Sequence, residues 1–489
     1  MFNLRGNCRT SGEQRRKESG NVFGEGSRTP ISITILVRKP KKDPEELAAI
    51  LYKDIGDYLT REDKLKTIKD FGSMLSASIG LSSIAPNEAG DWINQRDGLF
   101  ETFIPIGDKE EKSQKTFFVP FYSCGVKTQR DTWCYNFCKE VLASSMRRTI
   151  DFYNKHVGKE PIYSSTHINW TRATLNNLER GKKTSFSGES ICTAMYRPFC
   201  KQNLYFDRFW NEMVYQIPRL FPTPQSKNLV ICTAGVGSKT FSALITDQIP
   251  DLHILESGTQ CFPLYWYEKN ERDTLSLFDN GNSDYSRRSG LTNFILQRAR
   301  EEYGPKTSAE DVFYYVYGLL HSIDYRKKFA SDLTKDLPRI PLIGSTLDFK
   351  AFVKAGRKLA DLHLNYETGP LCQQLIITGD KPSKLNVTKM RFPSKEDKGT
   401  ILFNDSVKIE NIPMMAYDYV VNGKSAVEWV MERYAITKNA DSGIVNDPNL
   451  WSDNPRYILD LLSRVIQMSV ETQKIVAGLP KLDFTSQKS

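Results

Sequence analysis

The chain has 489 residues and a formal net charge of +9. This length predicts two to four domains with substantial cores, and the modest basic excess fits either an acidic polymer as partner or an ordinary protein surface. There is no run of eighteen apolar residues and no apolar segment of signal-peptide type at the N-terminus, so we expect a cytoplasmic protein with no membrane partner.

The nine cysteines are scattered without a paired framework. Cys134 and Cys138 form a single C-x3-C pair without a second pair, and the five histidines lie too far apart for a local metal motif. We therefore expect a reduced chain without a metal site.

The first forty residues predict the edge of a sheet. Residues 3–7 resemble the end of a strand, a polar glycine-containing loop follows, and residues 31–37 are β-branched and long enough for a buried strand. Residues 1–42 carry ten Lys/Arg and three Asp/Glu, a net +7. Because one hairpin buries too little surface to be stable alone, we expect the earlier strands of a larger sheet to be missing.

Further along, the pattern predicts a helix over 46–51, a second helix capped by Thr60 and Asp63, a strand over 116–122 and a long helix over 132–153. Strands are expected over 228–233 and 241–245, and a linker over 265–284 with a turn at Asp279–Asn282.

After Leu291 the pattern becomes helical. Thr307 and Glu310 have the spacing of a capping box, and apolar residues at helical spacing continue through Phe329–Leu337 and Phe349–Leu362. Short strands are expected over 375–378, 400–403 and 407–409, and two helices, over 426–434 and 456–477, close the chain.

Several different short motifs are distributed along nearly the whole chain. They are Asn3-Leu-Arg-Gly-Asn7, Arg9-Thr-Ser-Gly-Glu13, Asn21-Val-Phe-Gly24, Gly26-Ser-Arg-Thr-Pro-Ile-Ser-Ile33, Asp91-Trp-Ile-Asn-Gln-Arg96, Arg130-Asp-Thr-Trp133, Tyr196-Arg-Pro-Phe199 and Ser442-Gly-Ile-Val-Asn-Asp-Pro448. Together they resemble the late methyltransferase segment and the specificity domain of Type ISP restriction–modification enzymes. Those are long chains in which nuclease, helicase-like translocase, adenine-N6 methyltransferase and target-recognition parts follow one another.

The resemblance implies an α+β, multi-domain fold. Residues 1–42 would be the C-terminal strands, a sheet-edge hairpin, of a Rossmann-like methyltransferase domain, and residues 43–110 a helical connector. Residues 111–285 would form a mixed α/β target-recognition region, and residues 286–489 the helix-rich C-terminal part of the specificity domain.

The motifs of methyl transfer are absent from this sequence. An enzyme resembling this family needs an Asn/Asp-Pro-Pro-Tyr/Phe loop and a glycine-rich turn for S-adenosylmethionine, and the chain has no Pro-Pro dipeptide. We therefore expect no catalytic residue here and no cofactor bound by this chain alone, whereas the complete enzyme would bind S-adenosylmethionine.

Phe23 is the residue most indicative of function. In enzymes resembling this family, an aromatic at this position stacks on the flipped adenine, because an extruded base needs a π-face to replace its lost stacking. The alternative is that Phe23 packs in a core. The basic residues around it suit phosphates or guanine edges, or else lie on a solvated loop; they are Arg5, Arg9, Arg15, Arg16, Lys17 and Arg28.

A second set of basic residues lies in the middle of the chain, with aromatic residues among them. We predict that these residues contact DNA, mostly at phosphates, although any one of them could be a plain surface residue. They are Lys127, Arg130, Arg172, Lys182, Lys183, Arg197, Lys201 and Arg208.

Three functions stay open at this point. The chain could be the DNA-binding specificity portion of a Type ISP-like enzyme of bacterial defence, which directs adenine-N6 methylation and DNA cleavage by parts missing here. It could instead complete an active methyltransferase with a separately encoded partner, or dock a translocase as a scaffold. In each case we expect the missing methyltransferase, helicase and nuclease portion as partner, in the same gene or in a separate subunit. Double-stranded DNA is the expected partner of the specificity portion, and the sequence does not indicate which bases are recognised.

Overall fold

The computed structural model describes residues 1–10, 12–38, 47–74, 76–110, 115–164, 166–270 and 284–484. The chain divides into two compact units: unit 1 comprises Met1–Phe100 with Asn422–Lys424, and unit 2 comprises Glu101–Val421 with Ser425–Ser489. The predicted boundary at residue 42 falls outside the described residues, and the division into four segments stays a prediction.

Unit 1 is built on a four-stranded sheet in the order β2-β1-β3-β4. β1 (Phe2–Arg5) is antiparallel to β2 (Ile31–Ile33) and parallel to β3 (Ile50–Asp54), which is antiparallel to β4 (Ser82–Ile84). The helices of this part are α1 (Gly12–Glu18), α2 (Arg61–Phe71) and α3 (Gly98–Glu101). The predicted cap of α2 is confirmed, because Thr60 and Asp63 form a capping box.

Two expectations for unit 1 are corrected. The strand expected over 31–37 is regular only over Ile31–Ile33, and it is exposed rather than buried, because β2 is an edge strand with β1 as its neighbour. The prediction of a helix over 46–51 is wrong at its end, because Ile50 and Leu51 begin β3. Pairing with β1 and β4 decides the conformation there, against the helical spacing of the apolar residues. Residues 39–46 lie outside the described part.

Unit 2 contains two four-stranded sheets, in the orders β11-β10-β13-β6 and β12-β8-β9-β7. Their strands are β6 (Ser123–Cys124), β7 (Tyr135–Asn136), β8 (Ile191–Arg197), β9 (Cys200–Tyr205), β10 (Val230–Thr233), β11 (Ala243–Thr246), β12 (Ile249–Pro250) and β13 (Gln260–Pro263). Helices α4 (Asp131–Cys134), α5 (Lys139–His156), α6 (Arg172–Glu179) and α7 (Ile217–Leu220) belong to the same part. β10, β11 and β13 are hydrophobic and largely buried, which explains why the predicted strands at 228–233 and 241–245 form.

Three further expectations are corrected here. The helix expected over 132–153 is interrupted by β7, which pairs with β9, so α5 begins only at Lys139. The segment 116–122 is not a strand: Phe117 and Phe118 are buried, and Phe118 makes an isolated bridge to Leu291. The expected linker begins instead with β14 (Tyr265–Lys269), which pairs with β15 (Tyr285–Ser289), and the turn at Asp279–Asn282 lies outside the described residues.

The later part of unit 2 is rich in helices, as predicted. Its helices are α8 (Asn293–Tyr303), α9 (Ala309–Leu319), α10 (Ile323–Lys328), α11 (Asp332–Lys335), α12 (Thr346–Leu364), α13 (Ala426–Arg433) and α14 (Tyr457–Ala477). The cap of α9 is one residue later than expected, with Ser308 and Asp311 in the capping box. The remaining short strands are β5 (Ile104–Pro105), β16 (Arg339–Ile340), β17 (Ile376–Thr378), β18 (Ile401–Leu402), β19 (Lys408–Glu410), β20 (Val420–Val421), β22 (Thr437–Lys438) and β23 (Val445–Asn446), with β21 (Lys424–Ser425) at a boundary of the two units.

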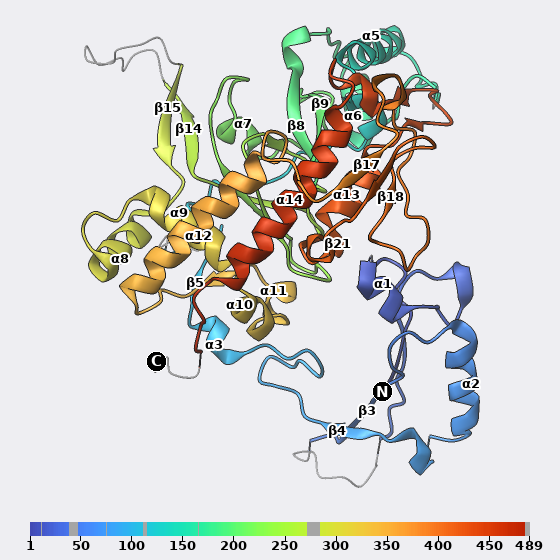
Figure 1. Ribbon diagram of the computed structural model, residues 1–489, viewed down its shortest axis with the longest axis vertical. Coiled ribbons are helices and arrows are strands. Elements are labelled where there is room, and N and C mark those ends of the chain that lie inside the picture. The colour runs from blue at the N-terminus through green and yellow to red at the C-terminus, as the bar shows by residue number, and fades with distance from the viewer. Residues whose placement is uncertain are drawn as a thin grey trace. The chain divides into compact units, whose positions relative to one another are not determined.

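Helix α12 lies between α9 and α14 (Figure 1). The crossing with α9 is close because both helices carry a glycine there: a Cβ on Gly356 would lie 1.9 Å from the Tyr314 carbonyl oxygen, and one on Gly318 would lie 2.5 Å from that of Phe352. Within the described part of the chain, no helix combines the length and the apolar character needed to span a membrane.

Candidate nucleic-acid interface

The loop after α1 presents Phe23 to solvent. The amide side chain of buried Asn21 donates to the carbonyl oxygens of Gly6 (3.0 Å) and Thr29 (2.7 Å), and its oxygen accepts from the Phe23 backbone N–H (2.9 Å). Buried Lys64 of α2 donates to the carbonyl oxygens of Glu18 (2.7 Å) and Gly20 (2.8 Å), which holds the beginning of the loop. The loop is therefore fixed at both ends while the Phe23 side chain is 69% exposed.

This exposure excludes a core position for Phe23 among the described residues, and its stacking role stays a prediction. The core of unit 1 consists of Phe2, Leu4 and Val22, with Phe71 of α2 packed against it. Phe23 lies outside this core and offers a free ring face from a well-anchored loop. Such an aromatic side chain is suited to stacking on a flat ligand.

The basic residues of unit 1 differ in how far they are engaged. Arg5 forms ion pairs with Asp54 (2.7 Å) and with Asp57, and Arg15 donates to the Ser19 carbonyl oxygen (2.8 Å) beyond the end of α1. Arg9, Arg16 and Arg28 are exposed and Lys17 is half-buried; Arg16 pairs with Glu13 on the surface. A surface pair of this kind is weak, so Arg16 can exchange its carboxylate for a phosphate.

A polar cavity of about 690 Å³ lies beside β1 in unit 1. Its lining includes Asn3, Arg5, Glu18, Tyr52 and Asp54. The Asn3 amide donates to the Tyr52 hydroxyl and to Asp54, both at 3.2 Å. The polar groups of β1 are thus tied to β3, and Arg5 belongs to this internal network as well as to the predicted basic set.

In unit 2, the predicted basic residues separate into two groups. Arg172, Lys182, Lys183 and Arg208 are exposed and Lys127 is half-buried. Arg130, Arg197 and Lys201 are engaged inside the protein, so in this conformation they are poor candidates for phosphate contacts. Lys201, for example, pairs with Glu367 at 2.5 Å, with both side chains mostly buried.

Arg130 is a structural residue in this conformation. It is buried, and its guanidinium donates to the Trp210 carbonyl oxygen (2.7 Å) and to the Thr171 hydroxyl (2.6 Å). Burial lowers the pKa of this guanidinium from its ordinary value. The contact with Thr171 joins the residues just before α4 and α6 across 41 positions of sequence, which no local pattern could have indicated.

Arg197 lies in a buried charge network at the end of β8. It donates to Asp251 at 2.7 Å and to Asp131 at 3.2 Å, and the Tyr135 hydroxyl donates to Asp251 at 3.0 Å. Burial raises the pKa of the Asp251 carboxyl to about 7, although Arg197 opposes this. Burial alone would lower the pKa of Arg197. The negative charges of Asp251 and Asp131 raise this pKa by more, so it stands above its ordinary value.

A polar cavity of about 300 Å³ lies next to this network. Three of the resembling motifs meet at it, because Asp131, Tyr196 and Asn446 all line it. The side-chain oxygen of Asn446 accepts from the Phe137 backbone N–H at 2.8 Å, and its side-chain NH2 donates to the side-chain oxygen of Gln202 at 3.1 Å. Among the remaining lining residues, Thr437, Lys438 and Asn439 were not indicated by the sequence, where only the neighbouring 442–448 motif was a signal.

No group of three or more His, Cys, Asp and Glu residues is placed to hold a metal ion among the residues that the structure describes. Unit 1 thus has a polar cavity and an exposed aromatic ring, unit 2 has a second polar cavity, and each unit carries exposed cations. Hydrogen-bonding side chains, exposed cations and a free aromatic ring are groups suited to binding bases and phosphates.

A family model for the Type ISP C-terminal specificity domain matches residues 117–461. The chain belongs to this family. The resemblance noted in the sequence is thereby confirmed, and so is a mixed helix-and-strand, multi-domain fold. No curated protein matches the chain.

Three solved structures are similar over almost the whole chain. A nuclease-deletion mutant of the Type ISP enzyme LlaGI in complex with a DNA substrate mimic is 38% identical over 99% of this chain and 44% of its own, with a TM-score of 0.85. The ATP-dependent Type ISP enzyme LlaBIII bound to DNA is 38% identical over 99% of this chain and 31% of its own, with a TM-score of 0.87. DrdV in a DNA complex is 30% identical over 98% of this chain and 47% of its own, with a TM-score of 0.79. The chain thus spans less than half the length of each of these relatives.

Proposed function

We propose that this chain recognises a DNA sequence on behalf of a Type ISP restriction–modification enzyme. The observation that carries this proposal is the similarity, over 98–99% of the chain, to three structures that contain DNA or a DNA mimic. Recognition would direct adenine-N6 methylation and DNA cleavage, which parts outside this chain would carry out with S-adenosylmethionine as the methyl donor.

Within this proposal, unit 1 forms one edge of a Rossmann-like methyltransferase sheet. Its mixed sheet and the exposed apolar side chains that follow β2 support this assignment, because an uncovered sheet edge with apolar neighbours is suited to further packing. Phe23 would then stack on the flipped adenine. A chain that completes an active methyltransferase with a separate partner is the second candidate, favoured by the same uncovered edge.

The exposed cations would contact phosphates and so set affinity rather than sequence. In unit 1 these are Arg9, Arg16 and Arg28, with half-buried Lys17 beside them in the sequence, and in unit 2 they are Arg172, Lys182, Lys183 and Arg208, together with half-buried Lys127. The 300 Å³ polar cavity of unit 2 offers amide and carboxylate groups of the kind that read base edges.

The first experiment is selection from a library of duplexes at two salt concentrations. If the chain recognises sequence, one short sequence survives the higher salt, because base contacts persist when phosphate contacts are screened. If binding is lost equally for all sequences, the chain alone is not a specificity module.

Phe23 is then tested on the selected duplex, with the methyltransferase portion of a relative supplied. Phe23→Ala should weaken binding about 5- to 150-fold, the equivalent of roughly 1–3 kcal/mol of base stacking, whereas Phe23→Trp should retain binding. Equal affinity of Phe23→Ala and the unaltered chain would contradict the stacking role.

Arg16→Ala has a matched control in Arg391→Ala, because each arginine is exposed and pairs with an exposed carboxylate on the surface. Removing Arg16 should lower affinity for all sequences equally and reduce the slope of log K against log salt by about 0.9. Arg391→Ala should leave both unchanged.

A further inference from the structure

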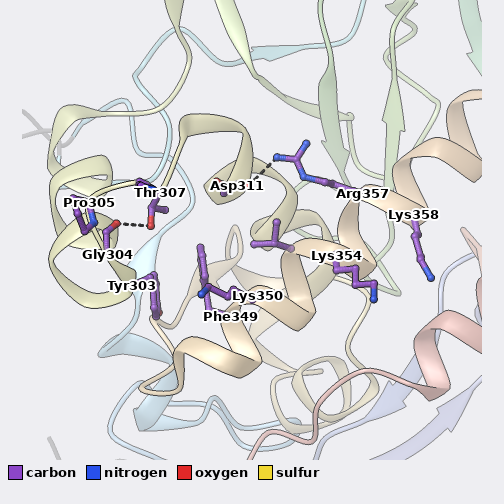
Figure 2. Close-up of a pocket in the computed structure, with 12 residues that line it drawn as sticks. Tyr303, Gly304, Pro305, Thr307, Asp311, Phe349, Lys350, Lys354, Arg357 and Lys358 are labelled. Atoms are coloured by element: carbon purple, nitrogen blue, oxygen red, sulfur yellow. Dashed lines mark hydrogen bonds and ion pairs between the residues drawn. The ribbon is translucent and has the colours of Figure 1, made fainter.

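A cationic groove of about 730 Å³ lies between α12 and the turn that joins α8 to α9. Figure 2 shows Lys350, Lys354, Arg357 and Lys358 along α12, with Gly304, Pro305 and Thr307 of the turn across from them. None of these residues belongs to the basic sets that the sequence indicated. The groove lies wholly within unit 2.

The floor of the groove is apolar and rigid. The rings of Tyr303 and Phe349 are stacked with centroids 3.8 Å apart and an interplanar angle of 8°. The Tyr303 hydroxyl donates to the Ile343 carbonyl oxygen at 2.8 Å, and Val353 is buried beside them. The floor is therefore closely packed, and the Tyr303 hydroxyl is already engaged.

The rim carries the charge. Five cations line the groove, Lys306, Lys350, Lys354, Arg357 and Lys358, against one acid, Asp311, so the lining has a net charge of 5 − 1 = +4. Asp311 pairs with Arg357 at 2.9 Å and also caps α9 through Ser308. Across the described residues, none of the four lysines has an ion-pair partner.

The spacing of these lysines is unfavourable for the isolated helix. Lys350, Lys354 and Lys358 are four residues apart, so neighbouring ammonium groups lie on one face and repel each other. The opposite face of α12 is buried against α9, β11 and α14. A bound polyanion would offset this repulsion, whereas water alone only screens it.

The groove does not have the form of a site for a small anion. A compact anion site has donors that converge on one point, and the N-terminus of α9, which could supply such donors, is already closed by the Ser308–Asp311 capping box. The available donors are long, exposed side chains spread over two turns of helix. Donors of this kind suit the phosphates of a nucleic acid strand, which are also distributed along a line.

We propose that the α12 groove binds the sugar–phosphate backbone of DNA outside the recognised sequence. This inference rests on the proposed function, which supplies the duplex, and adds a second point of contact to it. Contacts of this kind carry affinity and salt dependence but no base preference. The groove would thus anchor the DNA while other residues read it.

The test is the triple variant Lys350→Gln, Lys354→Gln, Lys358→Gln in the full chain. Glutamine has nearly the helix propensity of lysine, and all three positions are exposed, so the fold should persist and can be checked by circular dichroism. We expect the slope of log K against log salt to fall by about 2 to 3, since each lost phosphate contact removes about 0.9. Affinity should fall by the same factor for the selected sequence and for unrelated duplexes.

The matched control is Lys381→Gln, Lys384→Gln, Lys395→Gln, which removes the same charge from exposed positions outside the groove. It should leave the slope unchanged. If the groove variant retains the slope and affinity of the unaltered chain, or if both variants lose equally, the inference is wrong.

A direct titration with inorganic tripolyphosphate distinguishes the source of the phosphate. If tripolyphosphate binds the unaltered chain tightly, the triple variant loses that binding and duplex affinity is unchanged, the site takes a small polyphosphate and the backbone assignment is overturned. Weak tripolyphosphate binding with the predicted change in slope supports the backbone.

Failure of the proposed function is separable from failure of this inference. If the unaltered chain binds all duplexes equally, sequence recognition by this chain is contradicted, while the triple variant still reports on the groove through the slope. If no duplex binds even at low salt, both proposals are contradicted.

Discussion

The sheet of unit 1 and the core of unit 2 place apolar residues in opposite ways. Unit 1 has a small core around Phe2, Leu4 and Val22, yet Leu36 and Val37 just after β2 are 85% and 81% exposed. Unit 2 buries a continuous core that extends from the β8–β9 sheet to α13 and α14. Exposed apolar side chains of this kind are suited to further packing, as the proposed sheet edge in unit 1 would require, whereas the apolar residues of unit 2 already pack against one another.

The same contrast holds for charge. In unit 2, Arg197, Asp251 and Asp131 form a network inside the protein, and the groove lysines remain outside it on α12. In unit 1, Arg16 pairs with Glu13 on the surface, and the exposed ring of Phe23 follows it in the sequence. Buried charges thus secure the scaffold of unit 2, whereas the surface charges of both units are available to a ligand.

The largest effect is expected from removing Asp251. Asp251→Ala leaves the Arg197 guanidinium, whose side chain is mostly buried, with Asp131 as its remaining carboxylate. The free energy of unfolding should fall by about 3–5 kcal/mol, because a buried cation loses its main partner. Urea denaturation followed by tryptophan fluorescence measures this.

Asp251→Asn is the matched control for that change. It retains the volume of the side chain and an oxygen that can accept from the His253 N–H, which lies 2.7 Å from Asp251 in the structure. Because Asp251→Asn also removes the negative charge beside Arg197, its loss of stability should approach that of Asp251→Ala. A much smaller loss in Asp251→Asn would mean that side-chain volume and hydrogen bonding, not charge, are what Asp251 contributes.

How far the sequence predicts the structure depends on the range of the interactions involved. The caps and periodicity of α2, α12 and α14 are local signals, and these helices form as expected. The strand expected over 116–122 does not form, because burial of Phe117 and Phe118 rather than a ladder accounts for their hydrophobicity. Local patterns predict elements, but not which apolar run becomes a strand.

The site was predictable to the same extent. Phe23 could be singled out from its loop, and its exposure fits the role suggested for it. The internal engagement of Arg197 and Lys201 could not be predicted, because their partners Asp251 and Glu367 lie 54 and 166 residues away. The lysines of α12 did have a signal, a repeat every four residues, but only the structure shows that the turn at Gly304–Thr307 completes a groove around them.

Lowering the pH should have an intermediate effect on the free energy of unfolding, because unit 2 contains buried histidines. His363 Nδ1 lies 2.6 Å from the Tyr317 hydroxyl and its Nε2 lies 3.0 Å from the Thr472 hydroxyl, and burial lowers the pKa of His363 to about 3. Burial also lowers the pKa of His321 well below its ordinary value. Between pH 6.5 and 3 the folded chain therefore binds fewer protons than the unfolded chain, so stability present at pH 7 is lost as the pH falls.

Each of these histidines should contribute up to about 1.4 kcal/mol of lost stability per pH unit below about 6.5. His363→Gln should reduce the pH dependence of the unfolding free energy between pH 6.5 and 5 by about one proton, whatever its effect at pH 7. An unchanged slope in this variant would show that His363 does not titrate on unfolding.

The smallest effect on folding, and the most informative about unit 1, is expected from Leu36→Ser with Val37→Ser. Both side chains are exposed, so the free energy of unfolding should change by no more than about 0.5 kcal/mol, whereas Leu4→Ser in the core of the same unit should cause a loss of about 2–5 kcal/mol. If these residues are an interface, the double variant should also self-associate less in sedimentation velocity and bind less tightly to a separately supplied methyltransferase portion. A double variant that folds normally and binds that portion as well as the unaltered chain would mean that the apolar residues after β2 are not the covered edge, and the uncovered appearance of unit 1 would need another partner.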